Sequence, residues 1–416
     1  MRLERLSGAV EESVGKALVV AVTAAPGVHR LVFITVLSAI WSAAEVGLAA
    51  ADLGIASFLA ILSGGAVSGQ VMAKWARYPG SRFRTVLAFQ GFWWQLGALP
   101  IAGMVAWVLH RSGLVDSLTS TLLFFLGFSI WQIERTKLLS DRRIILLAGV
   151  EVVLLLVVSF AVMLAGSASS AVGIYGATLL LAGVTVAPVA MRTPRGCEHY
   201  GRESCEGLGY RDTATLAANG VVSSGREQLT VPAIKLVADS SMAGLVAQVS
   251  VMVASVLLLP RALANHYVPE LSRNVGGRDT ATEILSRYRR AMHAVLIGIT
   301  AAFLGGIALC WAFGIARPLL PLAALVGFMM IFGQASLLPS TVLTVQQRVA
   351  PILMSALTVT SGWAVVVAAL AFSDVSAWLA AVLMLGFSLF AAAARASYLH
   401  RVMDRNFLAK SGESAA

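Results

Sequence analysis

Four basic residues lie within, or at the ends of, long apolar stretches of the sequence, where a charge is costly. They are Arg30, Arg226, Lys235 and Arg261. A charged side chain near the centre of a bilayer costs about 2.5–3.5 kcal/mol on insertion scales, so such residues usually face a protein interior or a watery cavity. Guanidinium groups stay charged and donate hydrogen bonds in a planar fork that suits phosphate. These cations therefore predict a cavity for an anionic ligand.

Arg226 is the most informative of the four because of its depth. It lies 13 residues after Thr213, where its helix is expected to begin, which places it roughly 20 Å along that helix at 1.5 Å per residue. The neighbouring Glu227 points about 100° away on a helix and does not pair with it directly. The alternative is a structural ion pair with another helix, for which Glu151 is the candidate partner.

The other three cations have plainer alternatives. Arg30 could anchor a helix that begins later than expected, and Lys235 lies near the outer end of its helix, where it could reach water by snorkelling. Arg261, near the inner end of its helix, is typical of a cytoplasmic anchor. Acidic residues in or beside the apolar stretches are candidates for ion coupling or gating. These candidates are Glu45, Asp52, Glu151, Glu227 and Asp239.

Other chemistries lack their residue patterns in this sequence. There is no G-x-x-x-x-G-K-[ST] phosphate loop, which excludes ATP hydrolysis by that device. Cys197, His199 and Cys205 lie close together, but a fourth zinc ligand is missing, and no nucleophile triad is legible. No metal and no resident cofactor are expected, and a proton or sodium gradient is the candidate source of energy.

The composition identifies the elements that must position these residues. Of the 416 residues, 58% are hydrophobic and 12% are charged, and the mean hydropathy is +0.82. Soluble domains carry roughly 25% charged residues, so an ordinary soluble enzyme, a disordered protein and a disulfide scaffold are excluded. The apolar runs are long and continuous, as in spanning helices, and not short and alternating, as in barrel strands. An all-α polytopic membrane protein is expected.

Apolar runs of about 20 residues, the length of a spanning helix, divide the chain into twelve segments. The expected spans are Leu18–Trp41, Ala49–Ala73, Val86–Leu109, Leu118–Leu138, Ile144–Ala165, Ala171–Met191, Thr213–Leu236, Ala243–Ala264, Ala291–Trp311, Leu319–Leu343, Ala350–Phe372 and Val375–Ala394. The expected parts are an amphipathic surface helix at 1–16, a six-helix lobe at 17–191, a cytoplasmic loop at 192–212, a second six-helix lobe at 213–398 and a cytoplasmic tail at 399–416. The surface helix is expected because Leu3, Leu6 and Val10 are spaced by three and four residues.

The distribution of basic residues predicts the orientation of the chain. Of its 31 Lys and Arg residues, 25 lie at the two ends of the chain or in every second loop, and the opposite loops hold only Arg111 and Arg317. Cytoplasmic loops carry such an excess of positive charge. Both termini are therefore expected in the cytoplasm. The net charge of +10 follows from this pattern and does not indicate a nucleic-acid partner.

The two halves show faint internal similarity. Gly47-Leu48-Ala49-Ala50 in the second span corresponds to Gly244-Leu245-Val246-Ala247 in the eighth. Arg30 lies 17 residues before Gly47, and Arg226 lies 18 residues before Gly244, so each arginine falls near the middle of the first helix of its half. This spacing predicts two parallel repeats related by an axis along the membrane normal.

Two segments resemble a known family. The stretch that begins at Leu259 ends Tyr-Val-Pro-Glu-Leu-Ser-Arg at Arg273, and the stretch Val46–Ala50 leads to Lys74-Trp75-Ala76-Arg77-Tyr78. Both are similar to segments of Wzx-type polysaccharide flippases, in the multidrug/oligosaccharidyl-lipid/polysaccharide exporter superfamily. The resemblance implies a two-lobed transporter in the bacterial inner membrane. It would carry undecaprenyl-diphosphate-linked oligosaccharides of O-antigen, common antigen or exopolysaccharide from the inner to the outer leaflet.

The resemblance also implies a site and partners. The family uses a cationic central cavity lined by its first and seventh helices, among others, and Arg30, Arg226 and Lys235 stand at suitable positions here. Transport would proceed by alternating access while the prenyl chain stays in membrane lipid. A polysaccharide polymerase and the chain-length machinery are candidate protein partners.

Three other classes fit the sequence less well. A drug or cation antiporter of the same superfamily would need an acidic cavity for its cationic substrates. A membrane-embedded glycan polymerase would be an enzyme with a sizeable catalytic loop, whereas the outward loops here are short. A peptidoglycan-precursor flippase resembles fourteen-helix proteins, and this sequence supplies twelve apolar segments.

Overall fold

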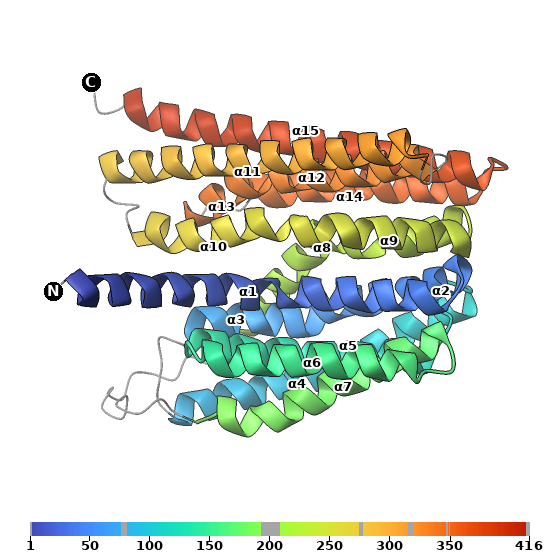
Figure 1. The fold of residues 1–416 in the computed structure, drawn as a ribbon, viewed down its shortest axis with the longest axis horizontal. Coiled ribbons are helices and arrows are strands. Elements are labelled where there is room, and N and C mark those ends of the chain that lie inside the picture. The colour runs from blue at the N-terminus through green and yellow to red at the C-terminus, as the bar shows by residue number, and fades with distance from the viewer. Residues whose placement is uncertain are drawn as a thin grey trace. The chain divides into compact units, whose positions relative to one another are not determined.

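A computed structural model describes residues 2–75, 81–192, 209–273, 278–314, 319–346, 348 and 350–412. Within these ranges the secondary-structure elements are helices (Figure 1). Nine candidate spans in the described residues are long and apolar enough to cross a membrane. Large apolar side chains on them are exposed, among them Ile145, Leu156 and Phe160, as expected for lipid-facing surfaces. The prediction of an all-α polytopic membrane protein is confirmed.

The described residues of the first half form six helical segments, five of which are candidate spans. Its helices are α1 (Arg2–Ile40), α2 (Ala43–Ala60), η1 (Ile61–Gly65), α3 (Ala66–Lys74), α4 (Ser81–Arg111), α5 (Leu118–Ser140), α6 (Ile144–Met163) and α7 (Ala168–Ala190). The π-helical turn η1 joins α2 to α3 without a break, so these three elements form one segment. Pro26 lies inside α1 and does not end it.

The second half also contains six segments. Its helices are α8 (Tyr210–Val237), α9 (Ser240–Val256), α10 (Leu258–Arg273), α11 (Arg278–Ala312), α12 (Leu320–Ala335), α13 (Leu337–Val345), α14 (Ala350–Ala371) and α15 (Ala377–Gly412). Only Leu257 separates α9 from α10, and only Ser336 separates α12 from α13. Counted as single interrupted segments, they bring the described helical segments to twelve, one for each predicted span, and nine of these segments contain a candidate span.

The second segments of the two halves correspond in detail. Each begins at an N-cap: the side chain of Ser42 accepts a hydrogen bond from the Glu45 amide, and that of Asp239 accepts one from the Met242 amide. Regular α-helix then ends at a similar depth in both, after Ala60 and after Val256. Irregular turns inside a helix often mark functional positions. The shared interruption supports the two-repeat organisation that the sequence predicts.

The N-terminal residues differ from the prediction of a separate surface helix at 1–16. Residues 2–16 continue directly into the first span as part of α1. The predicted boundary contains no residue that breaks a helix, since the first proline of the helix is Pro26. The apolar side chains that suggested a surface face lie outside the described side chains.

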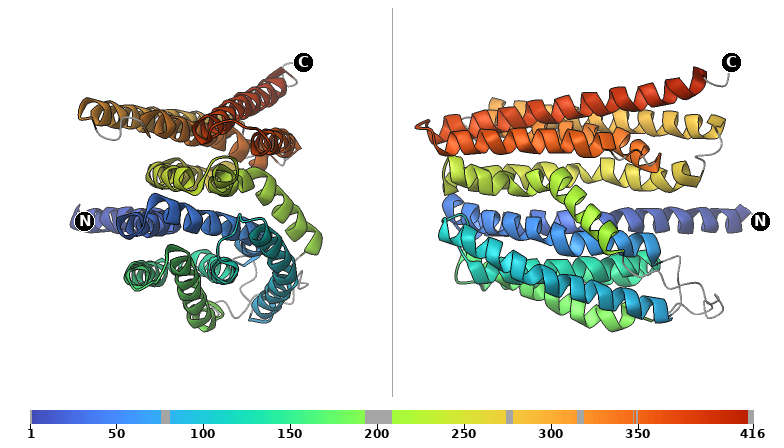
Figure 2. Two further views of the ribbon diagram at one scale, coloured as in Figure 1. Left: turned by 90° about the vertical axis from the view of Figure 1, so that its right-hand side faces the viewer. Right: turned by 180° about the vertical axis from the view of Figure 1, so that it is seen from behind.

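By packing, the chain divides into two compact units, Met1–Leu236 and Val237–Ala416. This division falls one helix later than the predicted loop at 192–212, because α8 packs in the first unit. A Cβ atom on Gly54 of α2 would lie 2.6 Å from the main-chain oxygen of Gln228, and one on Gly225 of α8 would lie 2.8 Å from Phe58. Small residues allow such close approach of helices in membranes. Figure 2 shows α8 running obliquely to α2.

A close helix pair also stabilises the first unit. A Cβ atom on Gly127 of α5 would lie 1.9 Å from the carbonyl oxygen of Gly176 on α7, so these two backbones touch directly. Nearby, Val67, Val71, Trp75, Leu87 and Ile133 form a buried apolar cluster.

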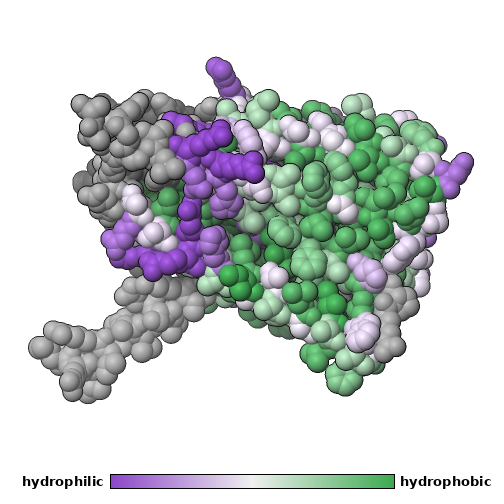
Figure 3. Space-filling view, turned by 90° about the horizontal axis from the view of Figure 1, so that it is seen from above, coloured by the Kyte–Doolittle hydropathy of each residue, from purple (hydrophilic) through white to green (hydrophobic). Residues whose placement is uncertain are grey.

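On the face seen in Figure 3, apolar side chains cover most of the described surface and hydrophilic ones gather near one end, as expected for a protein with lipid-facing helices.

Candidate functional site

Arg30 connects the first helix of the chain to α8. It lies in the middle of the candidate span Ala21–Ile40, so it is not the boundary anchor of a later-starting helix. Its Nη1 donates a hydrogen bond of 2.8 Å to Oε1 of Gln228. Tyr175 of α7 and Glu227 of α8 interact with it electrostatically. The half-buried guanidinium is thus held inside the first unit among α1, α7 and α8.

Arg226 has no such partner. It is partly buried on α8, and its Nη1 is shielded from solvent without a hydrogen-bond partner in the described part of the chain. Glu227 provides an electrostatic interaction. Glu151, the alternative partner that the sequence suggested, is engaged by other residues, so that pairing is wrong. Arg226 therefore keeps a terminal nitrogen that can donate to a ligand.

Glu227 relates the two arginines to each other. It interacts electrostatically with both Arg30 and Arg226. Gly225 marks the face of α8 that packs on α2, and at about 100° per residue Glu227 is turned roughly 200° from it. Two guanidinium groups and one carboxylate, which lies on the side of α8 away from α2, thus interact electrostatically. Their combined charge is positive, which suits an anionic ligand.

Glu151 belongs to a buried ion cluster within the first unit. Nε of Arg135 donates a 2.8 Å hydrogen bond to Oε1 of Glu151, and Nε2 of His29 lies 3.5 Å from Oε2. His29 also donates to the Glu151 carbonyl oxygen at 2.9 Å. His29 and Arg30 are successive residues of α1, so one side chain contacts α6 and the next contacts α8. This cluster fixes the rotation of α1 that presents Arg30.

Neither His29 nor Arg135 was among the site residues predicted from the sequence. Arg135 was counted among the cytoplasmic basic residues. Its position inside the expected span Leu118–Leu138 was the available signal, because a charge inside a span usually has a partner there. For His29, the sequence offered no comparable pattern.

Lys235 and Asp52 lie at the other end of the first unit. Nζ of Lys235 donates a 3.0 Å hydrogen bond to the carbonyl oxygen of Leu114. Asp52 is fully buried, and its two oxygens accept hydrogen bonds from the amides of Asp116 at 2.8 Å and Ser117 at 3.1 Å. Asp52 therefore caps the start of α5 from α2, and Lys235 contacts the loop that precedes it.

The remaining predicted site residues are not brought together with the two arginines. Glu45 forms the capping box of α2, where its Oε2 accepts hydrogen bonds from the amide and hydroxyl of Ser42. Asp239 is the N-cap of α9 and accepts from the Met242 amide at 2.7 Å. Arg261 is exposed on α10, in the second unit. Of the predicted site residues, Arg30, Arg226 and Glu227 belong to the first unit and interact electrostatically through Glu227.

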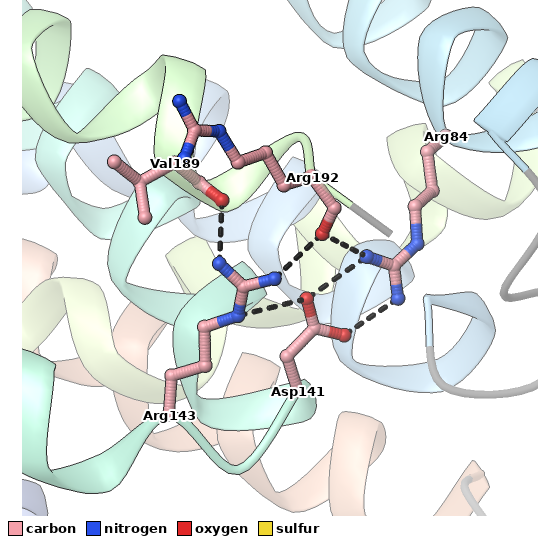
Figure 4. A network of polar contacts seen from close by, with 5 residues as sticks. All are labelled: Arg84, Asp141, Arg143, Val189 and Arg192. Carbon is pink, nitrogen blue, oxygen red and sulfur yellow. Dashed lines mark hydrogen bonds and ion pairs between the residues drawn. The ribbon is translucent and has the colours of Figure 1, made fainter. Parts of the chain in front are cut away.

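A second arginine cluster lies where the loops carry the basic residues assigned to the cytoplasm. Arg84 donates to both oxygens of Asp141, at 2.6 and 2.9 Å. Arg143 donates to the carbonyl oxygens of Val189 at 2.7 Å and Arg192 at 2.6 Å (Figure 4). The Arg84–Asp141 pair is almost fully buried. This network joins α4, the turn between α5 and α6, and the end of α7. Its role is therefore to hold these elements together.

No group of three or more metal-binding side chains occurs among the residues that the structure describes. Cys197, His199 and Cys205, which lack a fourth zinc ligand in the sequence, lie outside those residues.

Comparison with known proteins identifies a similar fold, but no sequence relative is found. No known family profile matches the sequence, and no curated protein is significantly similar to it. The fold is nevertheless that of MATE transporters of the MOP superfamily. The eukaryotic MATE transporter AtDTX14 aligns over 95% of this chain and 99% of its own, with a TM-score of 0.59 and 13% identity.

Two further solved structures extend this comparison. An inward-facing multidrug resistance MATE family transporter of the MOP superfamily aligns over 90% of this chain and 94% of its own, with a TM-score of 0.57 and 9% identity. A MOP superfamily transporter from Pyrococcus furiosus, described as having a binding pocket of reverse polarity, covers 94% of each chain with a TM-score of 0.51 and 11% identity. At such identities the similarity establishes the fold alone.

Proposed function

We propose that this protein is a membrane transporter that works by alternating access and carries an undecaprenyl-diphosphate-linked oligosaccharide from the inner to the outer leaflet. Transport is supported by the fold, whose other members include structures in inward-facing and outward-facing conformations. The basic loop residues support an orientation with both termini in the cytoplasm. The substrate class rests on the arginines of the first unit.

The observation that carries the proposal is the unpartnered Nη1 of Arg226, shielded from solvent within the described residues. A guanidinium held at this depth is unfavourable unless a ligand or a cavity compensates it. The diphosphate of a lipid-linked sugar would supply several acceptor oxygens and two or more negative charges. Charge-assisted hydrogen bonds of this kind are about twice as strong as neutral ones. Arg226 and Arg30 would thus attract the diphosphate while the prenyl chain stays in lipid.

The main alternative is an antiporter for cationic drugs; one structural neighbour is described as a multidrug resistance transporter. Such a substrate would need a carboxylate that is available in the membrane interior. In the first unit, Glu151 already pairs with Arg135, and Asp52 already caps α5. Glu227 interacts electrostatically with two arginines. These contacts favour an anionic substrate over a cationic one.

The test measures transport by the purified full-length chain in lipid vesicles. The probe is a fluorescent undecaprenyl-diphosphate disaccharide, and its transfer between leaflets is followed by quenching from outside. Arg226→Ala should lower the transfer rate at least tenfold, since a charged hydrogen bond contributes about 1.5–3 kcal/mol. Arg226→Lys should retain part of the rate, because the charge remains and the planar fork is lost.

Arg290→Ala on α11 is the matched control, because Arg290 is exposed, and it should transport as the wild type does. Wild-type protein that fails to accelerate transfer would contradict the proposed substrate. A rate for Arg226→Ala equal to that of the wild type would contradict the proposed site.

A further inference from the structure

Gln228 is the residue on α8 that holds Arg30. Its Oε1 accepts the 2.8 Å hydrogen bond from Nη1 of Arg30, across 198 residues of sequence. In the described part of the chain no hydrogen bond is assigned to the Nε2 of the same amide. An amide can accept through its oxygen and donate through its nitrogen at the same time. Gln228 can therefore hold Arg30 and still donate to a ligand.

The backbone around Gln228 is also held in place. Pro232 lacks an N–H group, so the carbonyl oxygen of Gln228, four residues earlier, loses its usual helical donor. That oxygen faces Gly54 of α2, where a Cβ atom would lie at 2.6 Å. The two helices therefore pack closely against each other at Gly54 and Gln228. The position of the Gln228 side chain is thus set by the packing of the two helices.

Gln228 is uncharged, and this affects the net charge of a site that binds anions. A carboxylate at this position would also accept from Arg30, but the resulting ion pair would cancel the charge of the guanidinium. With Glu227 already present beside two arginines, a second acid would make the cluster neutral. An amide fixes the direction of Arg30 and leaves the cluster cationic.

We propose that Gln228 is a positioning and specificity-determining residue, which orients Arg30 toward a diphosphate headgroup and donates to that headgroup through Nε2. The inference rests on the proposed function and deepens it, because it names the feature that selects phosphate over a cation. Arg30 and Gln228 then act as one unit, with the arginine supplying charge and the amide supplying direction.

The experiment compares two probes on the same preparation of full-length protein in lipid nanodiscs. One probe is radiolabelled undecaprenyl diphosphate, and the other is radiolabelled tetraphenylphosphonium, a lipophilic cation. Gln228→Glu should weaken binding of the diphosphate lipid by about tenfold or more and strengthen binding of the cation, because one guanidinium charge is cancelled. Gln228→Leu should weaken diphosphate binding by several-fold without strengthening binding of the cation. Arg30 loses the hydrogen bond that orients it and keeps its charge.

The ratio of the two affinities is independent of the fraction of protein that is folded, so a purely structural defect would not change it. Gln346→Glu, in the turn after α13, adds the same charge elsewhere and should leave the ratio unchanged. An unchanged ratio in both Gln228 variants would overturn the role of Gln228. If Arg226→Ala still abolished binding of the diphosphate lipid in that case, the proposed function would stand. Wild-type protein that binds no diphosphate lipid would overturn the function itself.

Discussion

The first unit contains two groups of arginines in very different surroundings. Near the loops, Arg84 donates through both terminal nitrogens to Asp141, and Arg143 donates to two main-chain carbonyl oxygens. Near the middle of α8, Arg226 has a shielded Nη1 without a partner among the described residues. Arg30 bonds to a neutral amide. One group uses its charge to hold helices together, and the other leaves its charge available.

The difference separates two uses of the same side chain. A buried arginine whose charge meets a carboxylate has its position fixed, so its removal should harm folding. A buried arginine that makes no hydrogen bond to a carboxylate is unfavourable in the membrane interior, so we expect it to be retained for a ligand. The hydrogen-bond partners of each guanidinium therefore indicate whether an arginine in this protein is structural or functional.

The largest effect on stability is expected from Arg84→Ala. This change leaves the Asp141 carboxylate, 2% exposed, with only Arg143 at 4.0 Å. Loss of one partner of a buried ion pair typically costs about 3–5 kcal/mol. The free energy of unfolding, measured in detergent by denaturant titration, should fall by that amount. Arg290→Ala on the exposed face of α11 should change it by less than about 0.5 kcal/mol. A loss below about 1 kcal/mol for Arg84→Ala would remove the distinction between the two groups.

Much of the fold could be predicted from the sequence, because each spanning segment is locally encoded. The apolar run predicted at Ile144–Ala165 became α6, Ile144–Met163, whereas α1, α11 and α15 extend beyond the predicted apolar runs into polar sequence. Bilayer thickness sets the length of the apolar runs, and charged loops set their ends. The interruptions after Ala60 and Val256 could not be predicted, since hydropathy does not register a π-turn. The placement of α8 in the first unit depends on contacts of Gly54 and Gly225, which hydropathy also ignores.

The candidate site could be predicted only in part, because ion pairing depends on which helix faces which. The depth of Arg226 in its helix was readable from the sequence. The partner of Glu151 was not, since Arg135 and His29 come from two other helices. Gln228 was not singled out either. A polar amide in an apolar helix is unremarkable until its contact with Arg30 is known.

An intermediate effect is expected from Gly54→Ala, which tests whether the packing of α8 on α2 positions the mid-membrane residues. The added Cβ would lie 2.6 Å from the Gln228 carbonyl oxygen, which is backbone and cannot move without shifting α8. Overpacking of this kind costs about 1–3 kcal/mol. The free energy of unfolding should fall by that amount, and the affinity for diphosphate lipid should fall with it, because Gln228 moves away from Arg30.

Gly97→Ala in α4 is the matched control for this substitution. A Cβ atom there meets nothing within 4 Å, and alanine in a helix is more favourable than glycine by roughly 0.5–1 kcal/mol. This variant should be as stable as the wild type or slightly more stable, with unchanged binding. If Gly54→Ala behaved like Gly97→Ala in both measurements, α8 would not depend on close packing at this point.

The smallest effect on stability is expected from Arg226→Leu, although Arg226 is also a partly buried arginine of the first unit. The substitution removes a partly buried charge whose Nη1 has no partner in the described residues, and it breaks no salt bridge among them. Leucine is also favourable inside a spanning helix. The free energy of unfolding in detergent should stay within about 0.5 kcal/mol of the wild type or rise, while transport of the diphosphate substrate is lost. A fall of about 3 kcal/mol, the size expected for Arg84→Ala, would mean that Arg226 is a structural residue like Arg84 and that its charge serves folding.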